Sequence, residues 1–283
     1  MGELIIRNAR QSDRQRLANL IHFEEYVHRH LDWKPALDWI GSPPYIIAER
    51  GDNLVAALAC PADPPGISWL RLYAVAAGMH LDTTWQLLWD EVCQQLISIR
   101  PVQVFALALQ DWFTALLRRR SFEHIQDVVV LVWDPDISGR IPTHQHVHIR
   151  PMAVEDLPVV YEVDKLAFGL EWQNSLAALD MALGQSVVAS IAEVNNEVVG
   201  YQISTSSSIG GHLARLAVRP SSQGQGIGTA LVCELLETFR ERRINQVTVN
   251  TQMDNRASLA IYENIGFKVT GESYPVFRLA VLA

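Results

Sequence analysis

The second half of the chain alternates between strand-like and helix-like spacing of its apolar residues. Runs rich in β-branched residues at 186–194 and 197–206 flank Asn195 and Asn196, a pair typical of a tight hairpin turn. From Ile227 onward the apolar residues recur every three or four positions, as on the buried face of a helix. Further strands are expected around 149 and at 212–218, 246–250, 267–273 and 276–281, and further helices at 154–168, 173–184 and 257–265. This order predicts an α+β fold whose sheet is mainly antiparallel, with one parallel step between 212–218 and 246–250, and with the last two strands closing it.

The first half repeats the same plan. Aligning Arg7 with Arg150 sets an offset of 143 residues, and the same offset places Tyr73 on Leu216. Other segments match at offsets of 144 and 145, which indicates one-residue insertions in a tandem duplication. We therefore expect two tandem domains of one fold, each a mixed, mainly antiparallel sheet flanked by helices. Their predicted bounds are 1–134 and 147–283, joined by a linker at 135–146 that contains Pro, Gly and Ser.

Composition and charge exclude several classes of protein. The 283 residues are 49% hydrophobic, enough for packed cores, and no apolar run reaches the length of a membrane span. The amino-terminal residues lack the basic and apolar regions of a signal peptide, and the three cysteines lack disulfide or metal-binding spacing, which indicates a cytoplasmic location. A formal net charge of -8 argues against nucleic acid and against an anionic membrane as partners.

Three glycines alternate in RPSSQGQGIGTAL, residues 219–231, where a strand gives way to a helix. Glycine costs about 0.8–1 kcal/mol against alanine inside a helix, so its presence here needs a reason. The amides of a helix N-terminus bind phosphates, and glycines let phosphate oxygens approach those amides closely. A Walker A loop would need a lysine after the glycines, and a dinucleotide fingerprint would need a glycine where Thr229 stands. The remaining phosphate-binding pattern is Gln-x-x-Gly-x-Gly, made by Gln223, Gly226 and Gly228.

Two segments of the second half resemble the signatures of one family. LARLAVRPSSQGQGIGTALVCELL at 213–236 resembles the acyl-CoA-binding motif of the GNAT acyltransferase superfamily, and NTQMDNRASLAIYENIGFKVTGE at 250–272 resembles its second signature. The resemblance spans 147–283 and reaches the first half as a faint, degenerate copy. It implies acetyl-CoA as co-substrate, with the pantetheine arm lying like an extra strand where two parallel strands splay apart. The residues it implies for cofactor binding are Leu216, Ala217, Val218, Gln223, Gly224, Gln225, Gly226, Ile227, Gly228, Thr229, Asn255 and Ser258.

The same resemblance places Tyr262 at the family's general-acid position. A phenol with a pKa of about 10 is protonated at neutral pH and can donate to a departing thiolate, whose conjugate acid has a pKa of about 8.5. Tyr262 is also interpretable as a helix residue that packs under the sheet. The motif does not identify the general base, and Glu193, His212 and Glu171 stay open as candidates.

Residues 167–176, AFGLEWQNSL, fall in the region that lines the acceptor site in this family. Phe168 and Trp172 in this segment are loosely similar to the ribosomal-protein N-terminal acetyltransferases, and they are interpretable as a substrate wall or as core. The resemblance implies acetyl transfer to a primary amine of a small molecule, a protein N-terminus or a lysine, by direct attack in a ternary complex. The alternative is a protein that keeps the fold and binds CoA as a sensor or scaffold without turnover. A homodimer is compatible with both.

Two other clusters carry weaker signals. His144, His146 and His148 alternate, a spacing that can ligate zinc, but they lie in or next to the linker and the family needs no metal, so no metal is expected. The three arginines at 118–120 are interpreted as a solvated helix end that complements the helix dipole.

The first half is expected to have lost CoA binding. The residues that stand there for Gly226, Gly228, Asn255 and Tyr262 are Thr83, Trp85, Gln110 and Leu117, in that order. Trp85 is expected to block the pyrophosphate position, and Asp82 to repel a phosphate. The sequence therefore predicts one acyl-CoA per chain.

Overall fold

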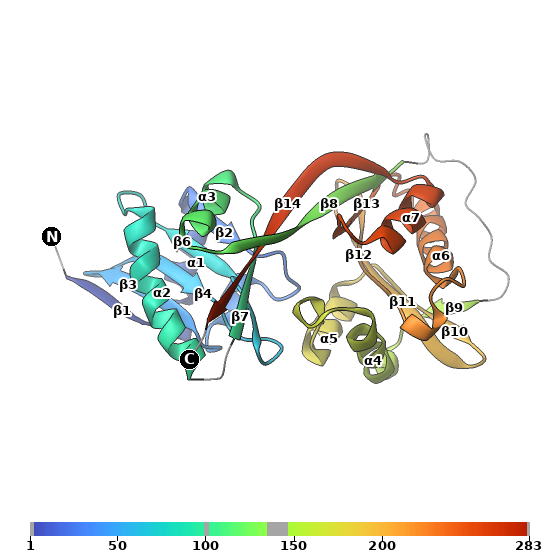
Figure 1. Ribbon diagram of the computed structural model, residues 1–283, viewed down its shortest axis with the longest axis horizontal. Coiled ribbons are helices and arrows are strands. Elements are labelled where there is room, and N and C mark those ends of the chain that lie inside the picture. The colour runs from blue at the N-terminus through green and yellow to red at the C-terminus, as the bar shows by residue number, and fades with distance from the viewer. Residues whose placement is uncertain (1–2, 99–101, 135–146, 282–283) are drawn as a thin grey trace. The chain divides into compact units, whose positions relative to one another are not determined.

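The computed structural model of the protein describes residues 3–98, 102–134 and 147–281 (Figure 1). Its contacts divide the chain into two compact units. Unit 1 comprises Met1–Ile125 and Tyr274–Ala283, and unit 2 comprises Gln126–Ser273. The linker predicted at 135–146 lies outside the described residues. Among the helices that the structure describes, none is long and apolar enough to cross a membrane.

Unit 1 contains a five-stranded antiparallel sheet in the order β1-β3-β4-β6-β2. A second group of strands begins with β5 and β7, which pair in parallel. The elements are β1 (Leu4–Asn8), η1 (Gln11–Asp13), α1 (Arg14–Phe23), β2 (Tyr26–Arg29), η2 (Ala36–Trp39), β3 (Tyr45–Arg50), β4 (Asn53–Ala59), β5 (Ile67–Trp69), β6 (Leu72–Val75), α2 (Leu81–Ile97), β7 (Val102–Leu107) and α3 (Asp111–Arg119).

In unit 2 the strands β9 to β12 are antiparallel neighbours, and β12 pairs with β13 in parallel. This confirms the single parallel step predicted between 212–218 and 246–250. Helix α4 packs on β11 and β12, and α6 packs on the opposite face of the same strands (Figure 1). The elements are β9 (His148–Pro151), η3 (Val154–Asp156), α4 (Leu157–Ala167), η4 (Leu170–Trp172), α5 (Leu176–Gln185), β10 (Val188–Val194), β11 (Glu197–Ser206), β12 (Gly211–Val218), η5 (Pro220–Ser222), α6 (Ile227–Glu241), β13 (Val247–Gln252) and α7 (Arg256–Ile265).

Two long strands are shared between the units. β8 (Glu123–Trp133) begins in unit 1, and its residues 128–133 pair with β13 of unit 2. β14 (Lys268–Val281) begins in unit 2, and its residues 276–281 pair with β7 of unit 1. The expectation that 267–273 and 276–281 form two strands closing the second sheet was therefore wrong. β8 and β14 are the equivalent last strands of the two copies, so the apolar pattern cannot tell which sheet each one completes.

The units defined by contacts thus differ from the ranges 1–134 and 147–283. Those ranges stay a prediction of where each copy begins and ends along the sequence. The exchange of β8 and β14 means that neither range holds all the strands of one sheet.

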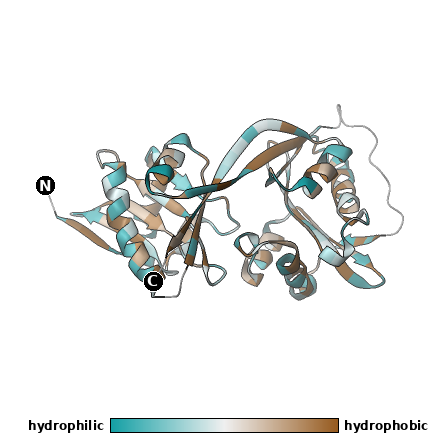
Figure 2. Ribbon diagram, viewed as in Figure 1, coloured by the Kyte–Doolittle hydropathy of each residue, from teal (hydrophilic) through white to brown (hydrophobic). Residues whose placement is uncertain are grey.

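The local predictions in unit 2 depend on individual residues. Asn195 and Asn196 both have positive φ, 52° and 64°, which confirms the hairpin turn between β10 and β11. The helix expected from 173 begins later, because Ser175 accepts a hydrogen bond from Ala178 N at 3.2 Å and caps α5. The apolar row of α6 is buried as expected and joins the core beneath the helix. Apolar residues dominate the central strands of each unit, and the helices carry polar residues on their outer sides (Figure 2).

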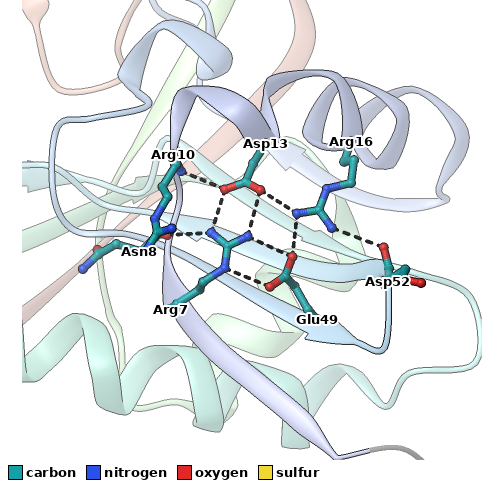
Figure 3. Close-up of polar contacts among 7 residues, drawn as sticks. All are labelled: Arg7, Asn8, Arg10, Asp13, Arg16, Glu49 and Asp52. Carbon is teal, nitrogen blue, oxygen red and sulfur yellow. Dashed lines mark hydrogen bonds and ion pairs between the residues drawn. The ribbon is translucent and has the colours of Figure 1, made fainter.

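A partly buried ion-pair triad occurs at the same place in both units. In unit 1, Arg7 contacts Asp13 at 2.7 Å and Glu49 at 2.8 Å, and Arg16 joins the group (Figure 3). The unit 2 triad is Arg150, Asp156 and Glu193. Arg150 contacts Asp156 at 2.7 Å and Glu193 at 3.0 Å. These residues follow the unit 1 triad at offsets of 143, 143 and 144, so a shared three-dimensional contact supports the predicted duplication.

Candidate functional site

The parallel pair of strands in unit 2 separates partway along its length. β12 and β13 are paired at three positions, of which the last joins Leu213 to Val249. On the other side of β12, the ladder to β11 skips Ala214, because Leu213 pairs with Ser204 and Arg215 pairs with Ile203. An extra residue of this kind bends a strand and interrupts its pairing. Beyond the bulge, residues 214–218 and 250–252 form no ladder with each other in the described structure, and we call this opening the splay.

The glycine loop lies directly after the β12 side of the splay. Gly224 and Gly226 have φ values of +75° and +79°, a left-handed conformation that glycine adopts without steric cost. The side chain of Gln223 donates to the carbonyl of Val218 at 3.0 Å and ties the loop to the end of the strand. The first turn of α6 closes with Ala230 N donating to the Gly226 carbonyl at 2.9 Å. The preceding amides, at 227–229, thus remain at a positive helix end, as an anion site requires.

Gly228 has a structural reason that the sequence did not reveal. A Cβ at this position would lie 2.9 Å from Cδ1 of Ile261. Gly228 is buried in the first turn of α6, so its missing side chain lets α6 approach α7. Gly224 differs, since a Cβ there would meet nothing within 4 Å. Only the exposed part of the loop is open to an approaching phosphate.

Helix α7 carries the residues of the second signature. Asn255 caps this helix, because its side-chain oxygen accepts a hydrogen bond from Ser258 N at 3.2 Å. The side-chain amide nitrogen of Asn255 is then the group left to donate elsewhere. The other residues predicted to bind the cofactor lie nearby: Leu216 and Ala217 in the outer half of β12, Gln225 in the glycine loop, and Ile227 and Thr229 in the first turn of α6.

Tyr262 is buried, with 4% of its surface exposed, and its ring packs against Phe267 at 5.5 Å between centroids. It belongs to the same buried cluster as Leu213 and Val249, the last pair before the splay. Burial raises the pKa of Tyr262 above its ordinary value, and its hydroxyl bonds to no residue that the structure describes. Tyr262 therefore stays protonated at neutral pH and keeps a donor available.

Of the three candidate bases, His212 lies on the face that carries α4. Val247 and Val249 enter the cluster beneath α6 and α7, so Thr248 between them faces the opposite side of the sheet. His212 Nδ1 lies 2.9 Å from the Thr248 hydroxyl, which itself donates to the Gly211 carbonyl at 3.4 Å. This pattern assigns the proton to Nδ1 and leaves Nε2 as the basic nitrogen. Burial lowers the pKa of His212, against a smaller opposing effect of Thr248, so the imidazole is neutral at pH 7.

The two carboxylates are placed differently. Glu193 belongs to the unit 2 triad and contacts Arg150 at 3.0 Å and His148 at 3.1 Å. Hydrogen bonds from His148 and Arg150 lower the pKa of Glu193, which makes it a poor proton acceptor. The first copy holds Glu49 in the same contact with Arg7. We therefore assign Glu193 a structural role in the triad and not the role of the base. Glu171, in η4, folds its carboxylate back toward the backbone of Gly169.

A buried polar cluster beside the splay was missed by the sequence analysis. Asp164 of α4, fully buried, accepts hydrogen bonds from Arg215 Nε at 2.8 Å and from the hydroxyl of Tyr201. Arg215 Nη2 also donates to the carbonyl of Trp172 at 2.7 Å, and its guanidinium lies 3.6 Å from the centroid of the Phe168 ring. Phe168 and Trp172 therefore both contact Arg215 of this polar cluster. Neither interpretation, as apolar core or as the wall of the acceptor site, included this contact. The aligned sequences contained a signal for this cluster, because the first copy has apolar residues at the positions of Asp164, Tyr201 and Arg215.

The first copy departs from the expectation for Trp85. This residue is fully buried and stacks on Trp89 at 5.3 Å, so it lies in the core of unit 1 and does not obstruct a helix end. Helix α2 begins at Leu81, three residues earlier than the 143 offset assumes. Asp82 occupies its first turn, where Arg119 and Arg120 neutralise it at 3.0 Å and 3.2 Å. Arg118 and Arg119 are exposed in the last turn of α3, as expected of a solvated helix end, and Arg119 and Arg120 in addition pair with Asp82. The N-terminus of α2, where a phosphate would bind, therefore already holds the carboxylate of Asp82.

Among the described residues, no group of three or more His, Cys, Asp or Glu could hold a metal ion. His144 and His146 lie outside the described residues. The splay, the helix end and the buried donor Tyr262 form one side of a site suited to an extended ligand with an anionic group.

Residues 148–267 match the profile of the acetyltransferase (GNAT) family. Over 119 residues the chain is 25% identical to a ribosomal protein bS18-alanine N-acetyltransferase of Escherichia coli K12, covering 42% of this chain and 79% of that protein. Over 122 residues it is 29% identical to an uncharacterized N-acetyltransferase of Methanocaldococcus jannaschii, covering 42% of this chain and 77% of that protein.

Two solved structures share the fold of nearly the whole chain. A GCN5-related N-acetyltransferase from Sphaerobacter thermophilus has a TM-score of 0.65 and 18% identity, covering 99% of this chain and 96% of its own. A tandem GNAT protein from the clavulanic acid biosynthesis pathway has a TM-score of 0.66 and 15% identity, covering 99% of both chains. At these identities the likeness supports the fold alone, and it confirms the predicted α+β class.

Proposed function

We propose that the second unit, whose residues 148–267 match the acetyltransferase (GNAT) family profile, transfers the acetyl group of acetyl-CoA to a primary amine. The observation that carries the proposal is the splay, which opens at the bulge of Ala214 and leads directly to the glycine loop. An extended pantetheine arm can pair with the unpaired edge at 214–218, and the pyrophosphate can then reach the amides at 227–229.

The chain's own residues supply the remaining contacts. The amide nitrogen of Asn255 donates to the extended ligand, since its oxygen is used to cap α7. Gly224 leaves the loop backbone open to the phosphates, since a Cβ there would meet nothing within 4 Å, and Gly226 adopts the left-handed φ that shapes the loop. Gln223 keeps the loop against Val218, so that the anion site stays aligned with the strand edge.

Two side chains handle the protons of the reaction. His212, neutral and basic at Nε2, accepts the proton of the attacking amine. Tyr262 donates to the sulfur of the departing thiolate. Because burial raises the pKa of Tyr262, full proton transfer to a thiolate is uphill, and Tyr262 acts mainly as a hydrogen-bond donor.

The acceptor we propose is the α-amine of a protein N-terminus. Relatives of this chain include an enzyme named for acetylating an alanine of ribosomal protein bS18 and one named N-alpha-acetyltransferase 30 of Schizosaccharomyces pombe. An α-amine has a pKa of about 8, so a weak base such as His212 suffices, whereas a lysine amine of pKa about 10.4 would need a stronger one.

The test follows free thiol while the full chain is mixed with acetyl-CoA and a panel of amines, polyamines and peptides with free N-termini. We expect thiol release that depends on a peptide with a free α-amine, and no release with the same peptide blocked at its N-terminus. Saturable CoA binding without amine-dependent release across the panel would support the non-catalytic alternative instead. Release with lysine side chains or polyamines alone would contradict the proposed acceptor class.

A further inference from the structure

The segment after the first helix has different structures in the two copies. In unit 1 it forms β2, Tyr26–Arg29. In unit 2 the residues at the 143 offset, 169–172, form the 3-10 helix η4 and its N-cap. Equivalent parts of two copies of one fold thus take two arrangements, and the neighbours of each segment show why.

In unit 1 this segment fills the edge that is open in unit 2. β6, the counterpart of the outer half of β12, pairs with β4 on one edge and with β2 on the other. The second edge is the one that faces the splay in unit 2. The contact extends past the strand, because His28 Nε2 lies 3.0 Å from the Leu70 carbonyl and His30 N donates to the Arg71 carbonyl at 3.0 Å.

β2 also contacts the helix that corresponds to α7. The ring of His28 stacks on Phe113 of α3 at 3.9 Å, and Tyr26 meets Trp112 edge-on at 5.5 Å. Phe113 stands at the position of Ser258, one of the residues expected to meet the cofactor in unit 2. The first copy therefore holds a strand of its own chain where the second leaves the splay.

In unit 2 the same segment is held on the face of the sheet. Arg215, the first residue after the bulge, binds the Trp172 carbonyl at 2.7 Å, and Asp164 accepts from Asn174 N at 2.9 Å. Asp164 and Arg215 are joined to each other at 2.6 Å, and Tyr201 completes the group. We call these three side chains the clamp, since Arg215 bonds to the carbonyl of Trp172 and Asp164 to the amide of Asn174, at the C-terminal end of the segment.

The first copy lacks every member of the clamp. At the positions of Asp164, Tyr201 and Arg215 it has Ile21, Ala57 and Leu72. None of these three side chains can bond to a backbone carbonyl or amide. The copy with the clamp has an open strand edge, and the copy without it has that edge paired.

We propose that the Asp164–Arg215–Tyr201 clamp holds residues 168–174 off the strand edge and thereby keeps the acyl-CoA splay open. This inference rests on the proposed function. A buried ion pair gains little or no stability over well-packed apolar residues of similar volume, so its best-attested use is to select one arrangement over another. The clamp residues are thus positioning residues, which act on the cofactor through the segment they hold.

The test copies the first unit into the second. The double variant Asp164→Ile with Arg215→Leu removes both charges together, so that no unpaired charge is left buried. Calorimetry with acetyl-CoA should give an affinity at least about tenfold weaker than that of the unaltered chain, because a site that is filled nine-tenths of the time loses tenfold in apparent affinity. Hydrogen exchange of the amides at 215–218 should become slower in the variant without ligand, as expected if the segment pairs with this edge.

The matched control is Arg150→Met, which breaks the triad of unit 2 away from the splay. It is expected to lower the thermal midpoint without weakening acetyl-CoA binding more than a few fold. Arg215→Lys, which keeps the charge, should bind better than the double variant. Unchanged affinity or faster exchange at 215–218 in a folded double variant would overturn the clamp. If the double variant does not fold, Arg215→Gln, which removes the charge and the ion pair with Asp164, takes its place, and affinity and exchange equal to those of the unaltered chain in that variant would overturn the clamp. Failure of the unaltered chain to bind acetyl-CoA would instead overturn the proposed function.

Discussion

At the scale of single residues, burial decides which titratable groups are suited to the reaction. Tyr262 is buried without a bonding partner among the described residues, and His212 is half-buried beside a hydroxyl, so both are held in their neutral forms. Glu193 is held as an anion by Arg150 and His148. A neutral acid and a neutral base can exchange protons with a substrate at neutral pH, whereas a carboxylate held by cations cannot readily do so.

Replacing Tyr262 by Phe should lower turnover by about 10²–10⁴-fold, the usual contribution of a positioned acid. The ring contact with Phe267 survives the change, so acetyl-CoA affinity and the thermal midpoint should stay close to those of the unaltered chain. The measurement is single-turnover kinetics beside calorimetry. Unchanged turnover, with chemistry shown to be rate-limiting, would assign Tyr262 to packing alone.

The pH dependence of kcat/KM should report His212. Because burial lowers its pKa below 6.5, the base form is lost only as the pH falls through that lowered value. An α-amine acceptor loses its neutral form below a pKa of about 8. The slope of log kcat/KM against pH should therefore be one below pH 8 and steepen toward two below 6.5.

In His212→Gln the slope should stay at one throughout, with lower activity at neutral pH. A second slope that persists in the variant would show that another group titrates. Thr248→Val is the matched control, since it removes the hydroxyl beside His212 while leaving the imidazole in place.

At the scale of elements, the splay results from a bulge in one strand, and the anion site results from the helix that follows it. The anion site depends on no charged side chain, since the described loop presents backbone amides at 227–229 to the ligand. The two φ-positive glycines shape that loop, and Gly228 sets the distance between α6 and α7. The loop is therefore sensitive to bulk and indifferent to charge.

Replacing Gly226 by Trp should abolish acetyl-CoA binding, because the side chain would stand at the entrance to the helix amides. The change also adds strain, since a left-handed residue with a Cβ costs roughly 1–2 kcal/mol. Gly78→Trp is the matched control: Gly78 has φ +83° in the loop before α2 of unit 1, so it carries the same strain at another site. Calorimetry that finds equal acetyl-CoA affinity in both folded variants would refute the role of the loop.

At the scale of the whole molecule, two copies of one fold have diverged at the same strand edge. Unit 1 has a paired edge, an occupied helix end at Asp82 and Leu117 in place of the proposed acid. Unit 2 has the splay, the open amides and Tyr262. Each of these features of unit 1 removes one requirement for binding acyl-CoA or for acetyl transfer.

The chain should therefore bind one acetyl-CoA, in unit 2. A calorimetric titration should give one equivalent per chain, and Gly226→Trp should bring it to zero. Two equivalents, or one equivalent retained in that variant, would show that unit 1 binds the ligand. Because calorimetry measures binding and not turnover, the expected value of one equivalent applies to a chain without activity as well.

The amino-acid sequence by itself determined the α+β class, the hairpin at Asn195 and Asn196, the parallel step and the glycine loop. These depend on apolar period and turn chemistry, which act over a few residues. The offset between the copies was visible for the same reason, because Arg7 and Arg150 follow the same local pattern.

Only the tertiary structure decided which sheet β8 and β14 complete, where Trp85 packs, and that Asp164, Tyr201 and Arg215 form a group. The first is a choice between two equivalent edges, which local pattern cannot distinguish. The second depended on where α2 begins, three residues from the aligned position. The third joins side chains 37 and 51 residues apart, whose approach is set by the folding of α4 onto the sheet and by no signal within any one segment.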